Sequence, residues 1–330
     1  MLFAQFRTST YRSIGVSIGA VVVSHDSAED LLACLEALVG SAGLERVVVV
    51  DNASHDGSRA LVRGFGDPRV ELVVEEVNSG FAGGCNRGFR ELGSDFEYLA
   101  FLNPDVVVSP DCLQRAVDEM AADPRLAGVA PLLMRSDGET LDTVGQVLRR
   151  WTLEVSDRGY GAPPTPELMQ STDVLAACGA LAVFRQSALA TVTDDFGPWV
   201  QHYFCFWEDF ELGWRLVNAG WRIASCPEAV GTHRRGSGAA SGRGPLRWQR
   251  PPKLEACILS NRWMTLIRQL HPLDLLLRLP VLLVWDLGMV AAGAVRRPSL
   301  LGHLRRRWPV VVREWRNRSR DRRRRLHELP

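Results

Sequence analysis

The chain has 330 residues, of which 46% are hydrophobic, and a formal net charge of +1. A chain of this length can bury a sizeable core as one large α/β domain or as a domain with an appendage. Its seven cysteines are odd in number and include no Cys-x-x-Cys pair. This pattern argues against a disulfide framework or a zinc cluster and indicates reduced thiols in a cytosolic compartment. Residues 1–13 lack the apolar segment of a secretory signal, and we expect them to form a disordered leader.

Residues 16–102 alternate between strand and helix patterns. Nearly continuous apolar runs at 16–23, 47–50, 70–74 and 99–102 predict buried strands. Helical spacing of apolar residues over 28–39, and the stretch 57–65, predict helices between them. Such strands are typical of a mostly parallel sheet that is covered by helices on both faces. Right-handed crossovers place the carboxyl ends of these strands on one edge of the sheet.

Polar residues follow three of these strands. Asp26 follows the first strand, Asp51 the second, and the turn Asn103-Pro104-Asp105 the fourth. We expect them to converge at the edge where open α/β sheets bind ligands. Taken alone, the turn is equally consistent with a solvated aspartate, because Asn-Pro is ordinary turn chemistry. The motifs that accompany it favour a binding site.

A glycine-rich stretch over residues 78–88 lies between the third and fourth strands. It predicts a loop that leads into a helix at 89–92, where backbone amides that approach closely would hold a phosphate. A flexible connecting loop is the alternative. The glycine spacing does not match the Gly-x-Gly-x-x-Gly fingerprint, which argues against an NAD-dependent dehydrogenase.

The second half of the chain is less regular. Residues 110–122 predict a helix, and 129–134, 174–184 and 220–224 predict strands. Residues 136–172 are rich in glycine, proline and polar residues, which is typical of a substrate loop or a partly ordered flap.

A helix near residue 208 and a histidine after the last strand carry further chemistry. Glu208, Asp209 and Glu211 lie in the first turn of this helix beside aromatic residues. They either compensate the helix dipole or include a base with a raised pKa. His233 precedes a glycine-rich stretch at 234–244 that we expect to be mobile. It is either an ordinary surface or core histidine or a metal ligand, and an Asp carboxylate with an imidazole suits Mn²⁺ or Mg²⁺.

The C-terminal region has the pattern of a membrane-associating tail. Residues 254–270 predict an amphipathic helix, and the apolar stretch 273–295 is long enough to span a bilayer. Arg278, Pro280 and Asp286 interrupt it. Each charge at the bilayer centre costs about 2.5–3.5 kcal/mol, which favours a helix that lies in the interface.

Charge is divided unevenly along the chain. Residues 296–330 hold 13 arginines and three acidic residues, whereas the other 295 residues hold 26 basic and 35 acidic residues. The tail therefore carries about +10 and the rest about −9. Apolar helices directly before this cluster, with Trp308 and Trp315 within it, favour an anionic membrane surface over nucleic acid as the partner.

Five motifs and a histidine occur in an order that identifies a family resemblance. They are Val21-Val22-Val23-Ser24-His25-Asp26, Val50-Asp51-Asn52-Ala53-Ser54, Asn78-x-Gly80-Phe81-x-Gly83-x-x-Asn86-x-Gly88, Asn103-Pro104-Asp105, Glu208-Asp209-x-Glu211-Leu212 and His233. This set resembles family 2 glycosyltransferases of the A-type fold over about residues 16–270. Within that family it is most similar to bacterial rhamnosyltransferase-like members that build cell-surface polysaccharide.

The resemblance implies a donor site, a metal site and an acceptor site. Nucleotide and sugar diphosphate would be held by Val23, Ser24, His25, Asp51, Asn78, Gly80, Phe81, Asn86 and Asn103. Asp105 and His233 would bind the divalent cation Mn²⁺ or Mg²⁺, although Asn103 replaces the first acid of the family's Asp-x-Asp motif. Residues that would face the acceptor are Gly179, Ala180 and Trp207.

The resemblance also implies an inverting reaction. Asp209 matches the catalytic base, with Glu208 and Glu211 beside it, and Glu211 stands where relatives often have Asp. The expected activity moves a sugar, with rhamnose as one candidate, from a nucleotide-diphosphate sugar to a glycan or lipid-linked acceptor. The implied organisation is a leader at 1–13, a catalytic domain at 14–245 and a C-terminal helical region at 246–330, peripheral on the cytoplasmic face of the plasma membrane.

Two other functions are consistent with such a sheet. A nucleotidyltransferase would need a basic glycine-rich loop directly after the first strand, and Ser24-His25-Asp26 is not one. A non-catalytic sugar-binding membrane scaffold would not need Asp105, Asp209 and His233, so their presence argues against it.

Overall fold

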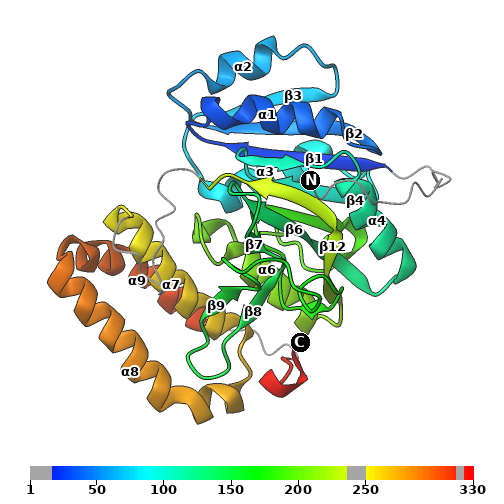
Figure 1. Cartoon of the computed structure of the whole chain (residues 1–330). Coiled ribbons are helices and arrows are strands. Elements are labelled where there is room, and N and C mark those ends of the chain that lie inside the picture. Colours follow the sequence, from blue (N-terminus) through cyan, green and yellow to red (C-terminus); the bar gives the residue numbers. More distant parts are fainter. Residues whose placement is uncertain (1–16, 236–249, 317–322) are drawn as a thin grey trace.

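The computed structural model of the protein describes residues 17–235, 250–316 and 323–330. The expected leader at 1–13 and most of the stretch at 234–244 lie outside these residues. Figure 1 shows a helix-covered sheet with three long helices, α7 to α9, beside it.

One mixed sheet forms the centre of the molecule. Its strand order is β10-β12-β6-β11-β4-β1-β2-β3, with β5 paired to β12 and β7 to β6. Parallel pairs join β1 (Ile18–Ser24), β2 (Leu44–Asn52), β3 (Val70–Glu75) and β4 (Tyr98–Leu102). The second half adds β5 (Val106–Val108), β6 (Leu126–Arg135), β10 (Asp173–Val174), β11 (Leu181–Arg185) and β12 (Arg222–His233). The α/β class is confirmed, but β11 runs antiparallel to both of its neighbours, so the sheet is less uniformly parallel than expected.

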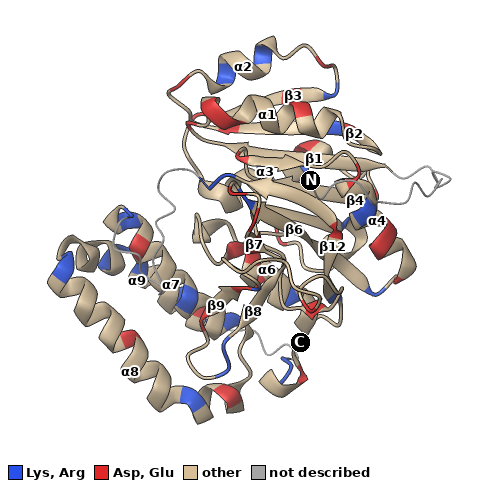
Figure 2. Ribbon diagram, viewed as in Figure 1, with Lys and Arg blue, Asp and Glu red and all other residues tan. Residues whose placement is uncertain are grey.

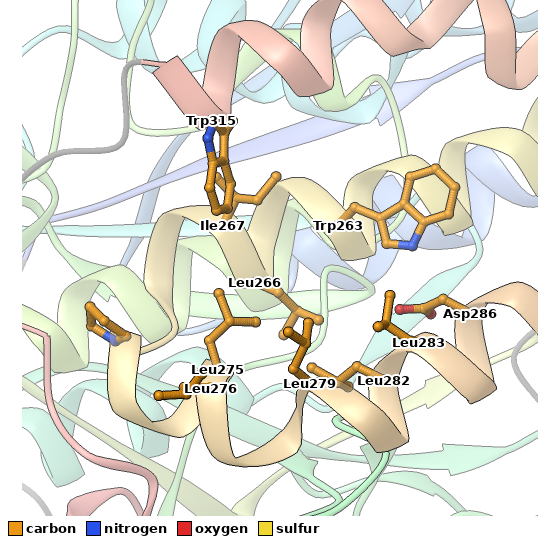
Figure 3. Close-up of a pocket in the computed structure, with 11 residues that line it drawn as sticks. Trp263, Leu266, Ile267, Leu275, Leu276, Leu279, Leu282, Leu283, Asp286 and Trp315 are labelled. Carbon is orange, nitrogen blue, oxygen red and sulfur yellow. The ribbon is translucent and has the colours of Figure 1, made fainter.

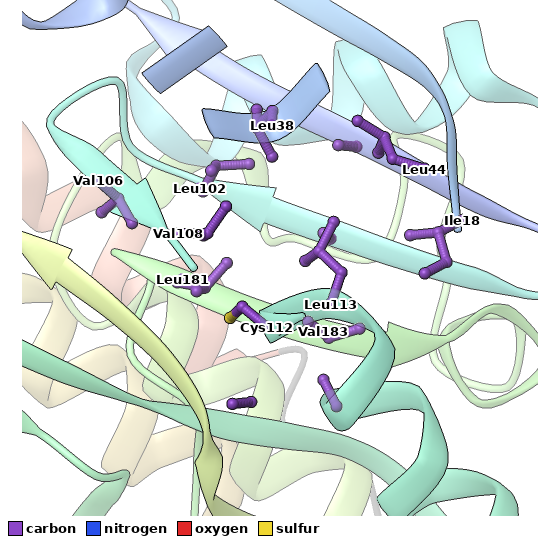
Figure 4. Close-up of a cluster of buried hydrophobic side chains, with 14 of the residues drawn as sticks. Ile18, Leu38, Leu44, Leu102, Val106, Val108, Cys112, Leu113, Leu181 and Val183 are labelled. Carbon is purple, nitrogen blue, oxygen red and sulfur yellow. The ribbon is translucent and has the colours of Figure 1, made fainter. Parts of the chain in front are cut away.

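Helices cover both faces of this sheet. Every residue of β1 is buried, and its side chains alternate between two apolar clusters. Ile18 packs on one face with Leu38 and Leu113 (Figure 4). That face is covered by α1 (Ala28–Val39), α2 (Ser58–Gly64) and α4 (Cys112–Ala122), and the other by α3 (Gly80–Leu92), α5 (Gln186–Ala190) and α6 (Glu208–Asn218).

The prediction of a glycine-rich loop at 78–88 is wrong, because α3 already begins at Gly80. The glycines allow this helix to approach β1 closely. A Cβ atom on Gly84 would lie 2.5 Å from Val23, and one on Gly88 would lie 2.3 Å from Val21. Close packing of helix on strand therefore outweighs the low helix propensity of glycine here.

The loose segment 136–172 contains three short strands. They are β7 (Leu141–Thr143), β8 (Gln146–Leu148) and β9 (Val155–Asp157), of which β8 and β9 form a hairpin. Residues 150–170 otherwise form turns and irregular structure, as expected for a loop. This segment lies beside α6 (Figure 1).

The C-terminal region forms α7 (Pro252–Gln269), α8 (Pro272–Arg296) and α9 (Ser299–Arg316). Short 3₁₀ turns form at Gln201–Tyr203 and Leu326–Glu328. In the described part of the chain, α8 alone is long and apolar enough to cross a membrane, and 6% of its most apolar window is buried. Figure 2 shows only a few charged residues along it.

Part of the arginine cluster holds these helices together instead of facing solvent. Arg307 donates to the Oδ1 atom of Asn261 at 2.5 Å, and Arg325 donates to Asp274 at 2.8 Å. Arg305 and Arg306 are exposed. Within the arginine cluster, Arg307 and Arg325 therefore have partners inside the protein, and the membrane surface stays a prediction for the exposed arginines.

Candidate active site

Two buried polar atoms without partners mark the edge where β1 and β2 end. Ser24 and Asp51 face each other across these strands. Among the described residues, neither the hydroxyl of Ser24 nor the Oδ1 atom of Asp51 has a hydrogen-bond partner. The Oδ2 atom of Asp51 accepts a bond from Arg59 at 2.5 Å. A buried polar atom without a partner is costly, so both atoms fit a polar ligand such as a nucleoside.

Asn52 holds the start of α3 next to this edge. Its side-chain nitrogen donates to the Gly80 carbonyl at 2.9 Å, and its oxygen accepts from the Ser79 amide at 2.9 Å. Asn78 accepts a bond from the Gly80 amide at 2.8 Å. The site residue Asn52 belongs to the motif after the second strand, but its contact to α3 was not predicted.

Asn86 of α3 joins this helix to the segment around Trp199. Its side chain makes two hydrogen bonds to the backbone of Trp199, at 2.7 and 2.9 Å, and is buried. Phe81 lies near Gly179, where a Cβ atom would meet the Phe81 ring at 3.1 Å. Val23 contributes to the packing of α3, and His25 is exposed beside Asp26.

The two expected metal ligands lie together at the end of the sheet. The antiparallel pairing of β5 with β12 places His233 opposite Val106, next to Asp105. The Nε2 atom of His233 lies 3.3 Å from the Asp105 carboxylate. Its Nδ1 atom lies 2.8 Å from Asp142, whose carboxylate is fully buried and also binds Arg235.

Asp142 was missed by sequence reasoning, because a single aspartate in a loose segment gives no signal. Burial alone lowers the pKa of His233, but the hydrogen bonds and charges of Asp105 and Asp142 outweigh it and raise this pKa to about 9. Among the described residues, no three His, Cys, Asp or Glu side chains gather as a complete metal cage. A carboxylate and a histidine oriented by a second carboxylate nevertheless fit a divalent cation whose other ligands come from a bound diphosphate and water.

Asp209 lies at the start of α6 and remains partly accessible. Its Oδ2 atom accepts the backbone N–H of Gly179 at 2.7 Å and the side-chain amide of Gln146 at 3.1 Å. Burial raises the pKa of Asp209, while these hydrogen bonds and that of the Phe210 amide oppose the shift. The net pKa is raised, as suits a general base. Gln146 gave no signal in the sequence.

The two neighbouring acids, Glu208 and Glu211, are buried, whereas Asp209 is partly accessible. Burial raises the pKa of Glu208 well above its ordinary value, and its Oε2 atom is without a partner among the described residues. Glu211 is fully buried and bonded to Arg215 at 3.0 Å and Arg268 at 2.9 Å. Burial raises the pKa of Glu211, but the two arginines lower it to a net value below the ordinary one. In this structure the Glu211 carboxylate is an ion-pair partner of both arginines, and its predicted catalytic role stays a prediction.

The segment 178–180 joins the two halves of the site. Gly179 binds Asp209, and the carbonyl of Ala180 accepts the backbone N–H of Asn103 at 3.0 Å. Asn103 precedes Asp105 by two residues. The residue predicted as the base and the turn predicted to bind the metal are therefore bonded to consecutive residues of one short segment.

Trp207 directly precedes α6 and has a left-handed backbone conformation. Phe204 and Phe206, just before it, also have positive φ angles. Asn261 of α7 holds this turn, because its side-chain nitrogen lies within 2.9 Å of the carbonyls of Tyr203, Cys205 and Phe206. The same turn covers Gly80, where a Cβ atom would lie 2.1 Å from the Phe204 carbonyl oxygen. A helix of the C-terminal region thus fixes the segment from which Asp209 projects.

Comparison with known proteins places this arrangement in a family. A profile described as "Glycosyl transferase family 2" matches residues 20–193. The chain belongs to glycosyltransferase family 2. As a member of this family it is an enzyme that transfers a sugar from a nucleotide-sugar donor.

Relatives of this glycosyltransferase include the N-acetylglucosaminyl-diphospho-decaprenol L-rhamnosyltransferase of Mycobacterium tuberculosis. It is 26% identical over 233 residues, which cover 60% of this chain and 69% of the relative. A mannosyltransferase of Pyrobaculum calidifontis, solved with GDP-Man and Mn²⁺, has a TM-score of 0.54 at 20% identity, and the match covers 93% of this chain and 83% of that one.

GalNAc-T7, solved with UDP, GalNAc and Mn²⁺, has a TM-score of 0.59 at 13% identity. The match covers 79% of this chain and 49% of the GalNAc-T7 chain, so the chain spans about half the length of that structure. These likenesses confirm the expected A-type fold.

Proposed function

We propose that this glycosyltransferase inverts the configuration of the sugar it transfers, with Asp209 as general base and Asp105 and His233 at the metal and diphosphate site. The observation that carries the proposal is the segment 178–180, which bonds to Asp209 at one residue and to the Asn103-Pro104-Asp105 turn at the next. A base and a diphosphate site on the two sides of one reacting carbon are what an inverting transfer requires.

Ser24 and Asp51 bind the nucleoside through the two polar atoms that lack partners in the described structure. Asp142 holds the Nδ1 atom of His233, so that Nε2 faces Asp105. A divalent cation bound there neutralises charge on the leaving diphosphate. The solved mannosyltransferase and GalNAc-T7, both with Mn²⁺, support this choice of cofactor.

Asp209 accepts the proton of the acceptor hydroxyl, whose oxygen attacks the anomeric carbon from the face opposite the diphosphate. The bond between the anomeric carbon and the diphosphate oxygen breaks, and the nucleoside diphosphate leaves. No covalent intermediate with the enzyme forms. Gly179 and Gln146 hold Asp209 in place, and Gly179 and Trp207 border the acceptor.

The similarity to the mycobacterial enzyme supports a choice of donor sugar and acceptor. Its name supports rhamnose as the sugar and a lipid-diphosphate-linked glycan as the acceptor. The apolar α8 and the exposed arginines of α9 support a peripheral position on the cytoplasmic face of the plasma membrane, where such lipids and nucleotide sugars meet.

The test is release of nucleoside diphosphate from a panel of nucleotide sugars, including dTDP-rhamnose, with and without Mn²⁺ or Mg²⁺. We expect release that depends on a lipid-diphosphate acceptor and the metal. Asp209→Asn should lower kcat by about 10²–10⁴-fold and leave donor affinity unchanged. The exposed Asp95→Asn serves as the matched control. Donor binding without any turnover would point to a scaffold, and release of inorganic diphosphate to a nucleotidyltransferase.

A further inference from the structure

A cavity of about 440 Å³ lies between the C-terminal helices, away from Ser24 and Asp51. Figure 3 shows Leu266 of α7 directed toward Leu275 and Leu279 of α8, with Trp315 of α9 at one side. The lining is apolar except for the carboxylate of Asp286, and Leu276 and Leu283 of α8 belong to it. This volume is in the range of small-molecule sites.

The cavity opens on a surface that suits lipid. Leu276 and Leu283 line it and are 66% and 51% exposed. The neighbouring Leu277 and Val284 on α8 are 67% and 76% exposed. An apolar face of this extent is unusual on a protein that meets only water, and marks contact with a membrane or a hydrophobic ligand. A hydrocarbon chain can therefore enter the cavity from the bilayer side.

A basic turn stands next to the cavity. Arg149, Arg150 and Trp151 follow β8 and are exposed. Arg278 of α8 fixes this turn by donating to the Arg150 carbonyl at 2.8 Å and stacking on Trp151 at 5.8 Å.

Arg262 fixes the rest of the turn to the cavity. It donates to the Thr152 carbonyl at 2.6 Å and to Asp286, a lining residue, at 2.9 Å. The turn that carries the exposed Arg149 and Arg150 is thus joined through Arg262 to Asp286 of the cavity lining. Arg149 also lies 4.0 Å from Glu154. A pair of exposed arginines on a turn joined to an apolar cavity is a charge pattern that complements a lipid diphosphate.

The same turn leads to the catalytic base. Gln146, whose amide donates to Asp209, begins the strand that ends just before Arg149. Three strand residues span about 10 Å, which is comparable with the length of a sugar that carries a diphosphate. Tail, diphosphate and sugar of one molecule can therefore contact the cavity, the basic turn and Asp209 at once.

We propose that the cavity holds the first part of the polyisoprenoid tail of the acceptor, whose diphosphate lies against Arg149 and Arg150 and whose sugar reaches Asp209. This inference rests on the proposed function for the identity of the acceptor. It assigns the tail and the diphosphate of the acceptor to separate sites outside the family motifs.

Photolabelling of the full chain in detergent micelles tests the site without measuring transfer. The probe is farnesyl diphosphate with a benzophenone on its tail. We expect labelled peptides within α7, the first half of α8 and the end of α9 at Trp315. We also expect competition by decaprenyl diphosphate but not by phosphatidylglycerol. Asp209→Asn should be labelled like the wild type, so failure of the transfer assay and failure of the binding site are distinguishable.

Variants locate the tail and the diphosphate. Leu276→Trp and Leu283→Trp place a larger side chain at the opening of the cavity. Each should weaken labelling by about tenfold, because the indole displaces part of the hydrocarbon tail of the probe from the cavity. Leu287→Trp, on the exposed face of α8 outside the lining, is the control. In a double variant with Arg149→Gln and Arg150→Gln, decaprenyl diphosphate should compete less well for labelling than it does in the wild type. Competition by decaprenol, which has no diphosphate, should be unchanged.

Thermal unfolding midpoints confirm that these variants fold. Labels that lie outside α7, α8 and the end of α9 at Trp315 would overturn the proposal. Labelling that Leu276→Trp and Leu283→Trp leave intact would also overturn it. Equal competition by phosphatidylglycerol would also overturn it, because the cavity would then hold any membrane acyl chain.

Discussion

Asp142 holds His233 through a 2.8 Å contact to its Nδ1 atom, and the opposite ring nitrogen faces Asp105. A buried carboxylate that orients a histidine in this way commonly sets the geometry of the metal ligand. The arrangement makes Asp142, which is 0% exposed and lies outside the family motifs, a positioning residue of the proposed metal site.

Asp142→Asn should lower the affinity for Mn²⁺ in the presence of nucleotide by about 10–100-fold, the usual effect of losing such an orienting carboxylate. Calorimetric titration of Mn²⁺ into the nucleotide complex measures it. The exposed Glu139→Gln, from the same segment, should bind like the wild type. Unchanged affinity in Asp142→Asn would remove the positioning role.

Gln146→Met should move the acidic limb of the kcat/KM profile to higher pH. The amide of Gln146 stabilises ionised Asp209, so its loss raises the pKa of that carboxyl further. Asp209 acts as a base only when ionised, and activity is therefore lost as pH falls through this pKa. A shift of about one pH unit is expected from a hydrogen bond to a charged group. The exposed Gln170→Met is the control, and a limb that stays in place would contradict the assignment.

Glu211→Gln should reduce the free energy of unfolding by about 3 kcal/mol, because it leaves buried arginine charge without its partner. The pKa of Glu211 is lowered on folding. Its contribution is therefore present above the pKa of the unfolded chain and is lost as pH falls, so the difference from wild type should shrink in acid. Urea denaturation at neutral and acidic pH measures both effects, with the exposed Glu36→Gln as control. Loss of kcat with intact stability would contradict this structural role and support the predicted catalytic one.

Arg305→Gln with Arg306→Gln should weaken binding to phosphatidylglycerol vesicles by about 30-fold, since each arginine near an anionic surface contributes about 1 kcal/mol. Both side chains are exposed, so stability should be unchanged. Vesicle sedimentation at low salt measures the binding. The exposed Arg125→Gln on the catalytic domain should sediment like the wild type. Equal sedimentation of the double variant would show that α9 does not face the membrane.

Local pattern was sufficient for the parallel half of the sheet, because continuous β-branched runs such as Val47–Val50 specify strands buried on both faces. The motifs that hold Asp105, Asp209 and His233 keep a fixed order along the chain, and the structure brings Asp105 within 3.3 Å of His233. The roles assigned to these three residues stay predictions. The glycines of α3 were interpreted wrongly, since their close contact with Val21 and Val23 is a long-range property that local propensity cannot show.

Residues that act through tertiary contacts gave no signal. Asp142 and Gln146 lie in short strands of three residues within a polar segment. Their roles come from pairing with β6 and from the approach of α6, neither of which leaves a periodic pattern. The ion pairs of Glu211 with Arg215 and Arg268 are also tertiary contacts that the sequence does not show.

The contacts of Asn261 have a consequence for where this chain can be cut. One amide group on α7 keeps the backbone around Phe206 in conformations that larger residues rarely adopt. A fragment that stops at residue 245 lacks Asn261, so the backbone at 203–206, just before α6, should relax. The carboxylate of Asp209 at the start of α6 would then lose its orientation in the site. We therefore expect the sugar-transferring part and the lipid-facing part to be inseparable by truncation, whatever the boundary in the sequence indicates.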